Sequence, residues 1–204
     1  MKNIRQQLSD RRSLDERFKE LDAHIEDPSF RTTSGMANEV NYWVFDYEPE
    51  RELDVREHIE QLKRRNSRED FSLVVFDLYD LIIDYLDAKH FTDKTILKEK
   101  KQGFDKVILA IRRTLKINSQ QNYLVTYMSE HIPENAVVLL TGIGKCYPIL
   151  EAPEVFNKIL YNMPSAFSAT PMILFYPGMY TEQELIMFNE KFEDNYYRAF
   201  RIAR

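Results

Sequence analysis

The chain has 204 residues and a formal net charge of −5, and 44% of its residues are hydrophobic and 13% aromatic. A chain of this length removes roughly 70% of its unfolded surface from water on folding, so this apolar content excludes an intrinsically disordered protein. No stretch approaches the roughly 18 uncharged apolar residues of a membrane span, and no signal-peptide core follows Met1. We therefore expect a single domain over residues 1–204, located in the cytoplasm.

The charge is unevenly distributed along the chain. Residues 1–60 hold 15 acids and 9 bases, whereas residues 94–116 hold 8 bases and 2 acids. The overall charge excludes a globally basic nucleic-acid binder, but it does not exclude a local basic patch. Cys146 is the only cysteine, so no intrachain disulfide forms, which agrees with a reducing compartment.

The first half of the chain alternates between helical and strand patterns. Ser13 and Glu16 form a capping-box pattern, and apolar residues then recur at helical spacing until Asp27-Pro28. After a polar loop, the patterns predict a strand at Val40–Tyr47, a helix after Pro49, a buried strand at Phe71–Phe76, a helix from Asp77 to Leu86, and two further helices covering Thr92 to Leu115.

The second half returns to strand patterns after one more helix. The patterns predict a helix from Ser119 to about Ile132, a strand at Ala136–Thr141, a turn at Gly142–Pro148, a helix at Pro153–Leu160, a strand at Met172–Tyr176, a helix after Thr181 carrying Leu185, Phe188 and Phe192, and a last strand at Tyr196–Ile202.

Strands separated by helices require crossover connections, which favour parallel pairing. We therefore expect an α/β fold: a three-layer domain with a mainly parallel sheet of about five strands and helices on both faces. The helical stretch at residues 92–132 is the one shift in composition, and it is typical of an insertion or subdomain.

Ligands of open α/β sheets usually bind beyond the carboxyl ends of the strands. There, Thr141, Gly142, Gly144 and Lys145 are candidate phosphate-binding residues, because glycines let backbone amides approach an anion and a lysine neutralises it. The spacing of a phosphate loop is absent, since Leu139 stands where its first glycine belongs and Cys146 follows the lysine. A tight structural turn is the alternative interpretation.

The other candidate groups give no complete catalytic or metal-binding motif. Asp46 and Asp77 each follow three apolar strand residues, as the metal-binding acids of nucleotide hydrolases do. A helix N-cap is the favoured interpretation for Asp77, and a strand end is the alternative for Asp46. The four histidines lack ligand spacing, and Cys146 has no identifiable base, so a buried thiol is expected. We expect no catalytic residue, no metal and no cofactor.

Two segments are candidate interaction surfaces. Leu97–Lys116 predicts an amphipathic helix whose bases, including Arg112 and Arg113, are either a solvated face or a contact with an acidic partner or a nucleic-acid backbone. The terminal segment with Tyr196, Tyr197 and Arg198 combines residue types that are enriched at protein interfaces, although an edge strand explains it equally.

Three blocks together resemble one family. The segments at residues 38–59 (NEVNYWVFDYEPERELDVREHI), 139–159 (LLTGIGKCYPILEAPEVFNKI) and 172–202 (MILFYPGMYTEQELIMFNEKFEDNYYRAFRI) are similar in order and spacing to the BrxB family of bacteriophage exclusion (BREX) systems. Tyr176 and Gly178 lie in these blocks, as do the residues of the terminal segment, and all of them are interaction candidates.

The resemblance implies a component of a phage-defence system that also contains a phosphatase-like protein, a DNA methyltransferase and a large ATPase, with indirect association with DNA. It transfers no catalytic residue. The expected function is a non-enzymatic interaction or scaffold protein that docks the phosphatase-like protein or the methyltransferase. The alternatives are a degenerate P-loop-like nucleotide- or phosphate-binding domain and a DNA-contacting accessory subunit.

Overall fold

The centre of the molecule is a parallel sheet. The structure is a computed structural model that describes residues 12–32, 41–66, 70–180, 184–187, 191–194 and 199–203. Five strands pair in the order β2-β3-β4-β1-β7, and all four of these pairings are parallel. The strands are β1 (Tyr42–Tyr47), β2 (Ser72–Asp77), β3 (Ala136–Thr141), β4 (Met172–Tyr180) and β7 (Phe200–Arg201). The expected mainly parallel sheet of about five strands is confirmed.

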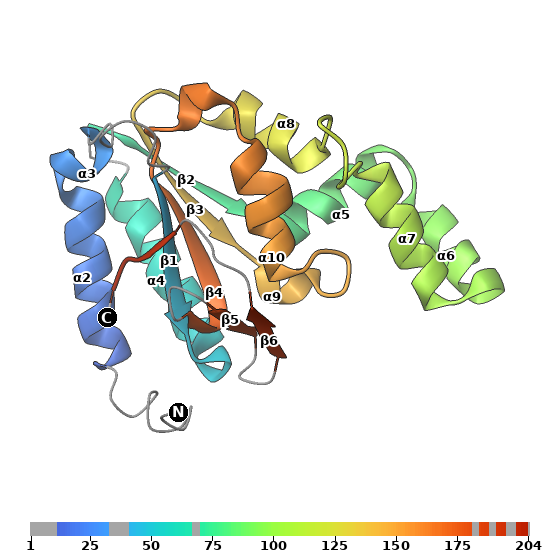
Figure 1. Cartoon of the computed structure of the whole chain (residues 1–204), viewed down its shortest axis with the longest axis horizontal. Coiled ribbons are helices and arrows are strands. Elements are labelled where there is room, and N and C mark those ends of the chain that lie inside the picture. The colour runs from blue at the N-terminus through green and yellow to red at the C-terminus, as the bar shows by residue number, and fades with distance from the viewer. Residues whose placement is uncertain are drawn as a thin grey trace.

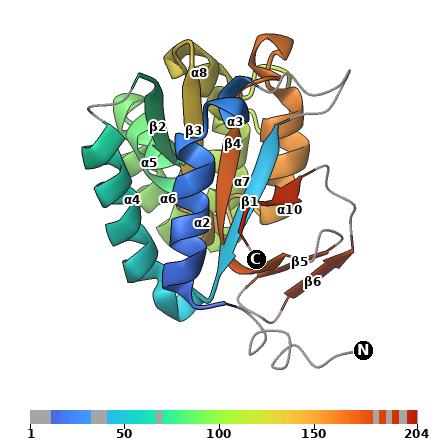
Figure 2. The same cartoon turned by 90° about the vertical axis from the view of Figure 1, so that its left-hand side faces the viewer.

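Helices cover both faces of this sheet (Figure 1). On one face, α2 (Leu14–Glu26) and α4 (Glu52–Asn66) share a buried apolar cluster with the strands, and Figure 2 shows both helices in front of the sheet. On the other face, the larger cluster joins the strands to α5 (Leu78–Ala88), α8 (Tyr123–His131) and the helical segment that begins with α10 (Ala152–Glu154). The three-layer α/β architecture is therefore confirmed.

Local signals explain where the helices on the α2 face begin. The Ser13 hydroxyl accepts from the Glu16 amide at 3.3 Å, and the Glu16 carboxylate accepts from the Ser13 amide at 3.0 Å, so the predicted capping box is confirmed. The short helix α3 (Pro28–Thr32) follows α2. Pro49 begins the 3-10 turn η1 (Pro49–Arg51), which leads directly into α4.

The connection from β3 to β4 is a chain of short helical turns on the α5 face. Its apolar side chains point into the larger core, and Phe156 is fully buried. The elements are α9 (Ile143–Cys146), α10, the π turn η2 (Val155–Ile159), and the 3-10 turns η3 (Leu160–Asn162) and η4 (Ser165–Phe167). The predicted helix at Pro153–Leu160 is thus present, although its middle turn is wider than an α-helical turn.

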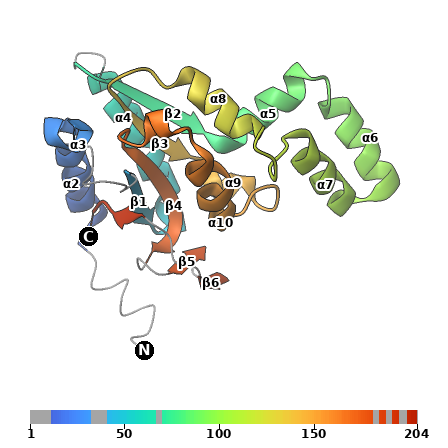
Figure 3. The ribbon, with the colours of Figure 1, turned by 45° about the horizontal axis from the view of Figure 1, so that its top comes forward.

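Residues 92–132 divide into two parts. Helix α8 packs in the core through Leu124, Val125 and Met128. Helices α6 (Thr92–Gln102) and α7 (Phe104–Thr114) form a hairpin that projects from the end of the molecule away from α2 (Figures 1 and 3). None of the described helices is long and apolar enough to cross a membrane.

The helix predicted after Thr181 is wrong. Residues 184–194 instead contribute β5 (Glu184–Met187) and β6 (Lys191–Asp194), which pair antiparallel with each other, while β5 also pairs with the end of β4. Strand β4 runs four residues beyond the predicted end at Tyr176, and its last residues offer unpaired backbone groups to β5. That pairing outweighs the local capping-box pattern, whose first three residues lie outside the described part.

The last predicted strand is shorter than expected. Of residues 199–203, only Phe200 and Arg201 are in β7, which pairs with Trp43 and Val44 of β1. The predicted start at Tyr196, together with Tyr197 and Arg198, lies outside the described residues.

Candidate functional site

A cavity of about 380 Å³ lies at the carboxyl ends of three strands, beside α4. Tyr47 ends β1, Asp77 ends β2 and Thr141 ends β3, and all three line the cavity together with Gly142 and Lys145. This is the edge of the sheet where α/β proteins usually bind ligands. The structure thus brings most of the predicted phosphate-binding candidates to one cavity; Gly144 lies in α9 and does not line it.

Gly142 is required by the close approach of a carboxylate. Its φ is +75°, and a Cβ atom added there would have the carboxyl carbon and both carboxylate oxygens of Asp77 within 2.9 Å. A glycine is therefore needed here because the carboxylate at the end of β2 leaves no room for a side chain after β3. The anionic group that this turn meets is the chain's own Asp77.

Asp77 and Lys145 are held by neighbouring groups. One Asp77 oxygen accepts from the amides of Tyr79 and Asp80, each at 3.1 Å, so the predicted N-cap of α5 is confirmed. Lys145 Nζ lies 2.7 Å from the other Asp77 oxygen and 3.0 Å from Asp80 Oδ1. Burial alone would lower the pKa of Lys145, but these two carboxylates raise it, so the ammonium stays charged and paired.

The remaining charges of the cavity are also paired within it. Arg56 lies 2.7 Å from Glu52, and Lys63 lies 2.7 Å from Glu60. The Tyr47 hydroxyl donates to Glu52 at 2.5 Å, and its pKa is raised first by burial and then by that hydrogen bond. Each of the seven charged side chains that line the cavity is therefore in an ion pair with another lining residue: Glu52, Arg56, Glu60, Lys63, Asp77, Asp80 and Lys145.

Cys146 follows Lys145 but faces the core. Its side chain is fully buried, as predicted, and its thiol donates to the Gly142 carbonyl at 3.3 Å. Burial raises the pKa of Cys146 to about 12, so the thiol is protonated at neutral pH. Because thiolate is the nucleophilic form, this geometry does not activate the cysteine.

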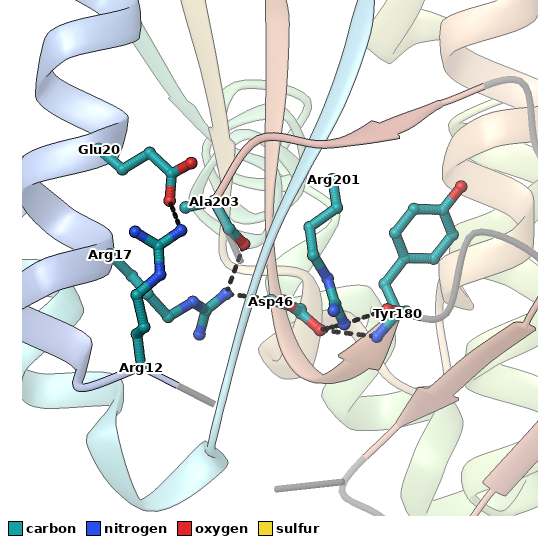
Figure 4. Close-up of polar contacts among 7 residues, drawn as sticks. All are labelled: Arg12, Arg17, Glu20, Asp46, Tyr180, Arg201 and Ala203. Atoms are coloured by element: carbon teal, nitrogen blue, oxygen red, sulfur yellow. Dashed lines mark hydrogen bonds and ion pairs between the residues drawn. The ribbon is translucent and has the colours of Figure 1, made fainter. Parts of the chain in front are cut away.

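A second polar cluster surrounds Asp46 at the end of β1 (Figure 4). Asp46 has no exposed surface, and its two oxygens lie 2.7 Å from Arg17 Nη2 of α2 and 2.5 Å from Arg201 Nη2 of β7. The Tyr180 amide donates to it at 2.8 Å, and Arg17 also donates to the carbonyl of Ala203. The acid predicted to end a strand thus joins three distant parts of the chain.

Sequence reasoning missed this cluster, although α2 carried a signal. Arg17 falls between Leu14 and Phe18 on the apolar stripe of the helix, and its side chain is only 2% exposed. A charged residue on an inward-facing stripe requires a buried partner of opposite charge. Local sequence does not identify that partner, because Asp46 lies 29 residues after Arg17. The second arginine of the cluster, Arg201, lies a further 155 residues after Asp46.

The predicted interaction arginines have different environments. Arg112 makes a bidentate ion pair with Glu154, with Nη1–Oε2 at 2.7 Å and Nη2–Oε1 at 2.5 Å, and also donates to the Ile149 carbonyl. It therefore ties α7 to α10. Arg113, the next residue, is exposed on the hairpin.

The predicted interaction residues of β4 lie inside the molecule. Tyr176 has no exposed surface, and Gly178 is buried and pairs with Met187 of β5. A partner would have to open the sheet to reach them. Tyr196, Tyr197 and Arg198 are outside the described residues. Within the described ranges, no three His, Cys, Asp or Glu side chains are grouped so that they would hold a metal ion.

Comparison with known proteins identifies the family. The family model described as "BREX protein BrxB" matches residues 74–202. A BREX protein BrxB of Bacillus cereus (strain H3081.97) is 38% identical over 193 residues, which cover 94% of this chain and 98% of the relative. A BREX protein BrxB of Escherichia coli O9:H4 (strain HS) is 27% identical over 192 residues, covering 93% and 92%.

No solved structure matches the chain significantly. The family model spans more than half of the chain, and the first of these relatives aligns over nearly all of it. The chain therefore belongs to the BrxB family of BREX proteins.

Proposed function

We propose that this chain is a non-enzymatic interaction subunit of a BREX phage-defence system, and that it docks the phosphatase-like protein or the methyltransferase of that system. The family supports a role in the system as a whole. We propose further that it acts in the bacterial cytoplasm, where its single thiol stays reduced.

The observation that carries this proposal is the pairing of charges at the carboxyl edge of the sheet. An enzyme of this fold keeps nucleophiles, bases or phosphate-binding cations there that reach the substrate. Here all three cations of the cavity are paired with its four carboxylates, and Lys145 is bound by two of them. An interaction role therefore fits this edge better than catalysis does.

Co-expression tests the proposal directly. The tagged full-length chain is produced together with the phosphatase-like protein, the methyltransferase or the ATPase of the same system, and each pair is purified in 150 mM and 500 mM salt. We expect one of the first two proteins to co-purify in a fixed ratio at both salt concentrations. If neither the phosphatase-like protein nor the methyltransferase binds the chain, the proposal is overturned, even if the ATPase does.

Nucleotide binding is the second candidate, favoured by the position and size of the cavity. About 380 Å³ falls in the range of small-molecule sites, and a glycine turn follows β3 beside it. A bound phosphate would have to displace Asp77 and Asp80 from Lys145. Titration calorimetry with ATP and Mg²⁺ decides between the candidates: measurable heat that disappears in Lys145→Ala would favour this one over a purely docking role.

A further inference from the structure

The α6–α7 hairpin carries several exposed apolar side chains. Of the eight large apolar residues that are exposed in the described part of the chain, Ile96, Leu97, Phe104 and Leu109 lie on this hairpin of 23 residues. Half of the exposed large apolar residues thus lie on one short hairpin, and exposed apolar surface beyond scattered single residues is typical of interaction sites.

The hairpin is poorly supported by the rest of the molecule. Helix α6 has no buried residue, and it packs mainly on α7. Helix α7 is anchored in the core through Val107 and Ile111. Because an isolated helix of 11 residues is marginal in water, α6 gains stability if a partner covers it.

A small pocket, here called the hairpin pocket, lies at the root of the hairpin. It has a volume of about 190 Å³, and its lining includes Leu86, Phe91, Lys94, Lys98, Ala110 and Ile111. That volume is below the roughly 300–1,000 Å³ of small-molecule sites, so it suits a single side chain rather than a nucleotide. Its apolar floor indicates that this side chain is apolar.

The basic residues around the hairpin pocket favour a partner that carries negative charge. Residues 92–114 hold seven bases and three acids, net +4, and since the whole chain has −5, the remaining residues have −9. Lys94 and Lys98 line the pocket itself, and Lys94 Nζ lies 4.9 Å from the centre of the Phe91 ring. Carboxylates that flank an apolar side chain of a partner would lie close to these ammonium groups when that side chain enters the pocket.

We propose that the hairpin pocket binds an apolar side chain flanked by carboxylates, presented by another protein of the BREX system. This inference rests on the proposed docking function and gives it a surface and a partner chemistry. The occupant is a protein because the pocket and the four exposed apolar side chains of the hairpin need apolar contact, which a phosphodiester backbone does not supply.

The test uses the full-length chain and whichever purified BREX protein binds it, with affinities measured by biolayer interferometry. The variant Lys94→Glu/Lys98→Glu reverses two charges at the pocket, and Lys100→Glu/Lys101→Glu makes the same change of charge toward the tip of the hairpin. We expect the pocket variant to weaken binding at least about tenfold and the tip variant by less than about threefold.

A third variant tests the apolar contact without changing charge. Ala110→Phe places a ring in the pocket and should also weaken binding at least about tenfold. Thermal melts show whether each variant is folded. The two lysine variants keep the test valid if Ala110→Phe destabilises the protein, because Lys98 is partly exposed and the other lysines are exposed.

Four results overturn the inference. Equal loss in both lysine variants with no effect of Ala110→Phe would indicate only long-range charge attraction. Binding of a 30-base-pair DNA duplex that both lysine variants abolish would assign the hairpin to nucleic acid. Self-association that the pocket variants abolish would make a second copy the occupant. If wild type binds a BREX protein and all variants bind it equally, this inference fails while the docking function stands.

Discussion

Asp46 shows how a single buried residue organises distant segments. A carboxylate with no exposed surface is costly to bury unless its charge is neutralised, and here two arginines and a backbone amide surround it. Arg17 comes from α2 and Arg201 from β7, so the carboxylate holds both elements against the carboxyl end of β1 (Figure 4). The cluster is therefore an anchor of the fold.

Replacing Asp46 by Asn should destabilise the protein strongly. The change leaves the buried Arg17 and the partly exposed Arg201 without their carboxylate, and breaking a buried ion pair typically costs about 3–5 kcal/mol. Urea unfolding followed by circular dichroism measures the loss. Asp54→Asn, which removes an exposed partner of Arg51, is the matched control and should leave the midpoint almost unchanged. Equal effects of both substitutions would contradict the anchor role.

Gly142 offers a second prediction at this scale. A left-handed backbone alone costs a non-glycine residue roughly 1–3 kcal/mol. Gly142→Ala combines a φ of +75° with a Cβ atom that overlaps the Asp77 carboxylate, so it should lower the free energy of unfolding by more than that. Gly103→Ala has a φ of +84° and a ψ of 168°, which also strain a non-glycine residue, but nothing lies within 4 Å, so it should lower the free energy of unfolding only by the roughly 1–3 kcal/mol of that strain. Similar unfolding midpoints for the two variants would show that the carboxylate moves away easily.

At the scale of elements, Arg112 joins the root of the hairpin to α10. Arg112→Gln removes a bidentate ion pair whose side chains are only 22% and 20% exposed. We expect a loss of about 1–2 kcal/mol at pH 7, measured as a lower midpoint in urea. Arg113→Gln, which changes an exposed neighbour, serves as the control and should have little effect.

The Arg112 contribution should also depend on pH. Burial alone would raise the pKa of Glu154, but the hydrogen bond from Arg112 lowers it below its ordinary 4.5. Because the folded-state pKa is depressed, the pair stabilises the protein fully above about pH 4.5 and loses this effect as pH falls through the lower folded value. The difference between wild type and Arg112→Gln should therefore narrow from pH 7 to pH 3. A constant difference would argue against an ionic origin.

The elements show which parts of the fold follow from local sequence. The pattern of Ser13 and Glu16 begins α2, and Asp77 caps α5, because both signals act within a few residues. The segment after Tyr180 was predicted as a helix and forms β5 and β6, because the free end of β4 supplies a pairing partner that no local pattern reveals.

The candidate site likewise has residues that local sequence predicts and contacts that it does not. Four phosphate-binding candidates could be found from the glycine turn at the end of a buried strand, and the structure places three of them at the cavity. The partners of Lys145 could not be found from the sequence, since Asp77 and Asp80 lie 65 or more residues earlier. They contact the lysine only because β2 pairs with β3.

At the scale of the whole molecule, the two ends of the described chain meet at one strand. Helix α2 near the start packs on the sheet, and β7 near the end adds its last parallel strand beside β1. Ile202 and Ala203 after β7 are 2% and 0% exposed in the core shared with α2. Folding of the N-terminal face therefore depends on residues at the far end of the sequence.

Ending the chain at Ala199 should accordingly unfold much of the protein. The truncation removes Arg201 from Asp46 and Ile202 from the core, and each loss typically costs about 2–5 kcal/mol. Their sum approaches the roughly 5–15 kcal/mol that stabilises an ordinary domain, and the uncovered edge of β1 invites aggregation. Soluble yield and melting temperature measure the effect. Removing only Arg204 is the control, and a truncated protein that melts as wild type does would show that β1 and α2 hold together without β7.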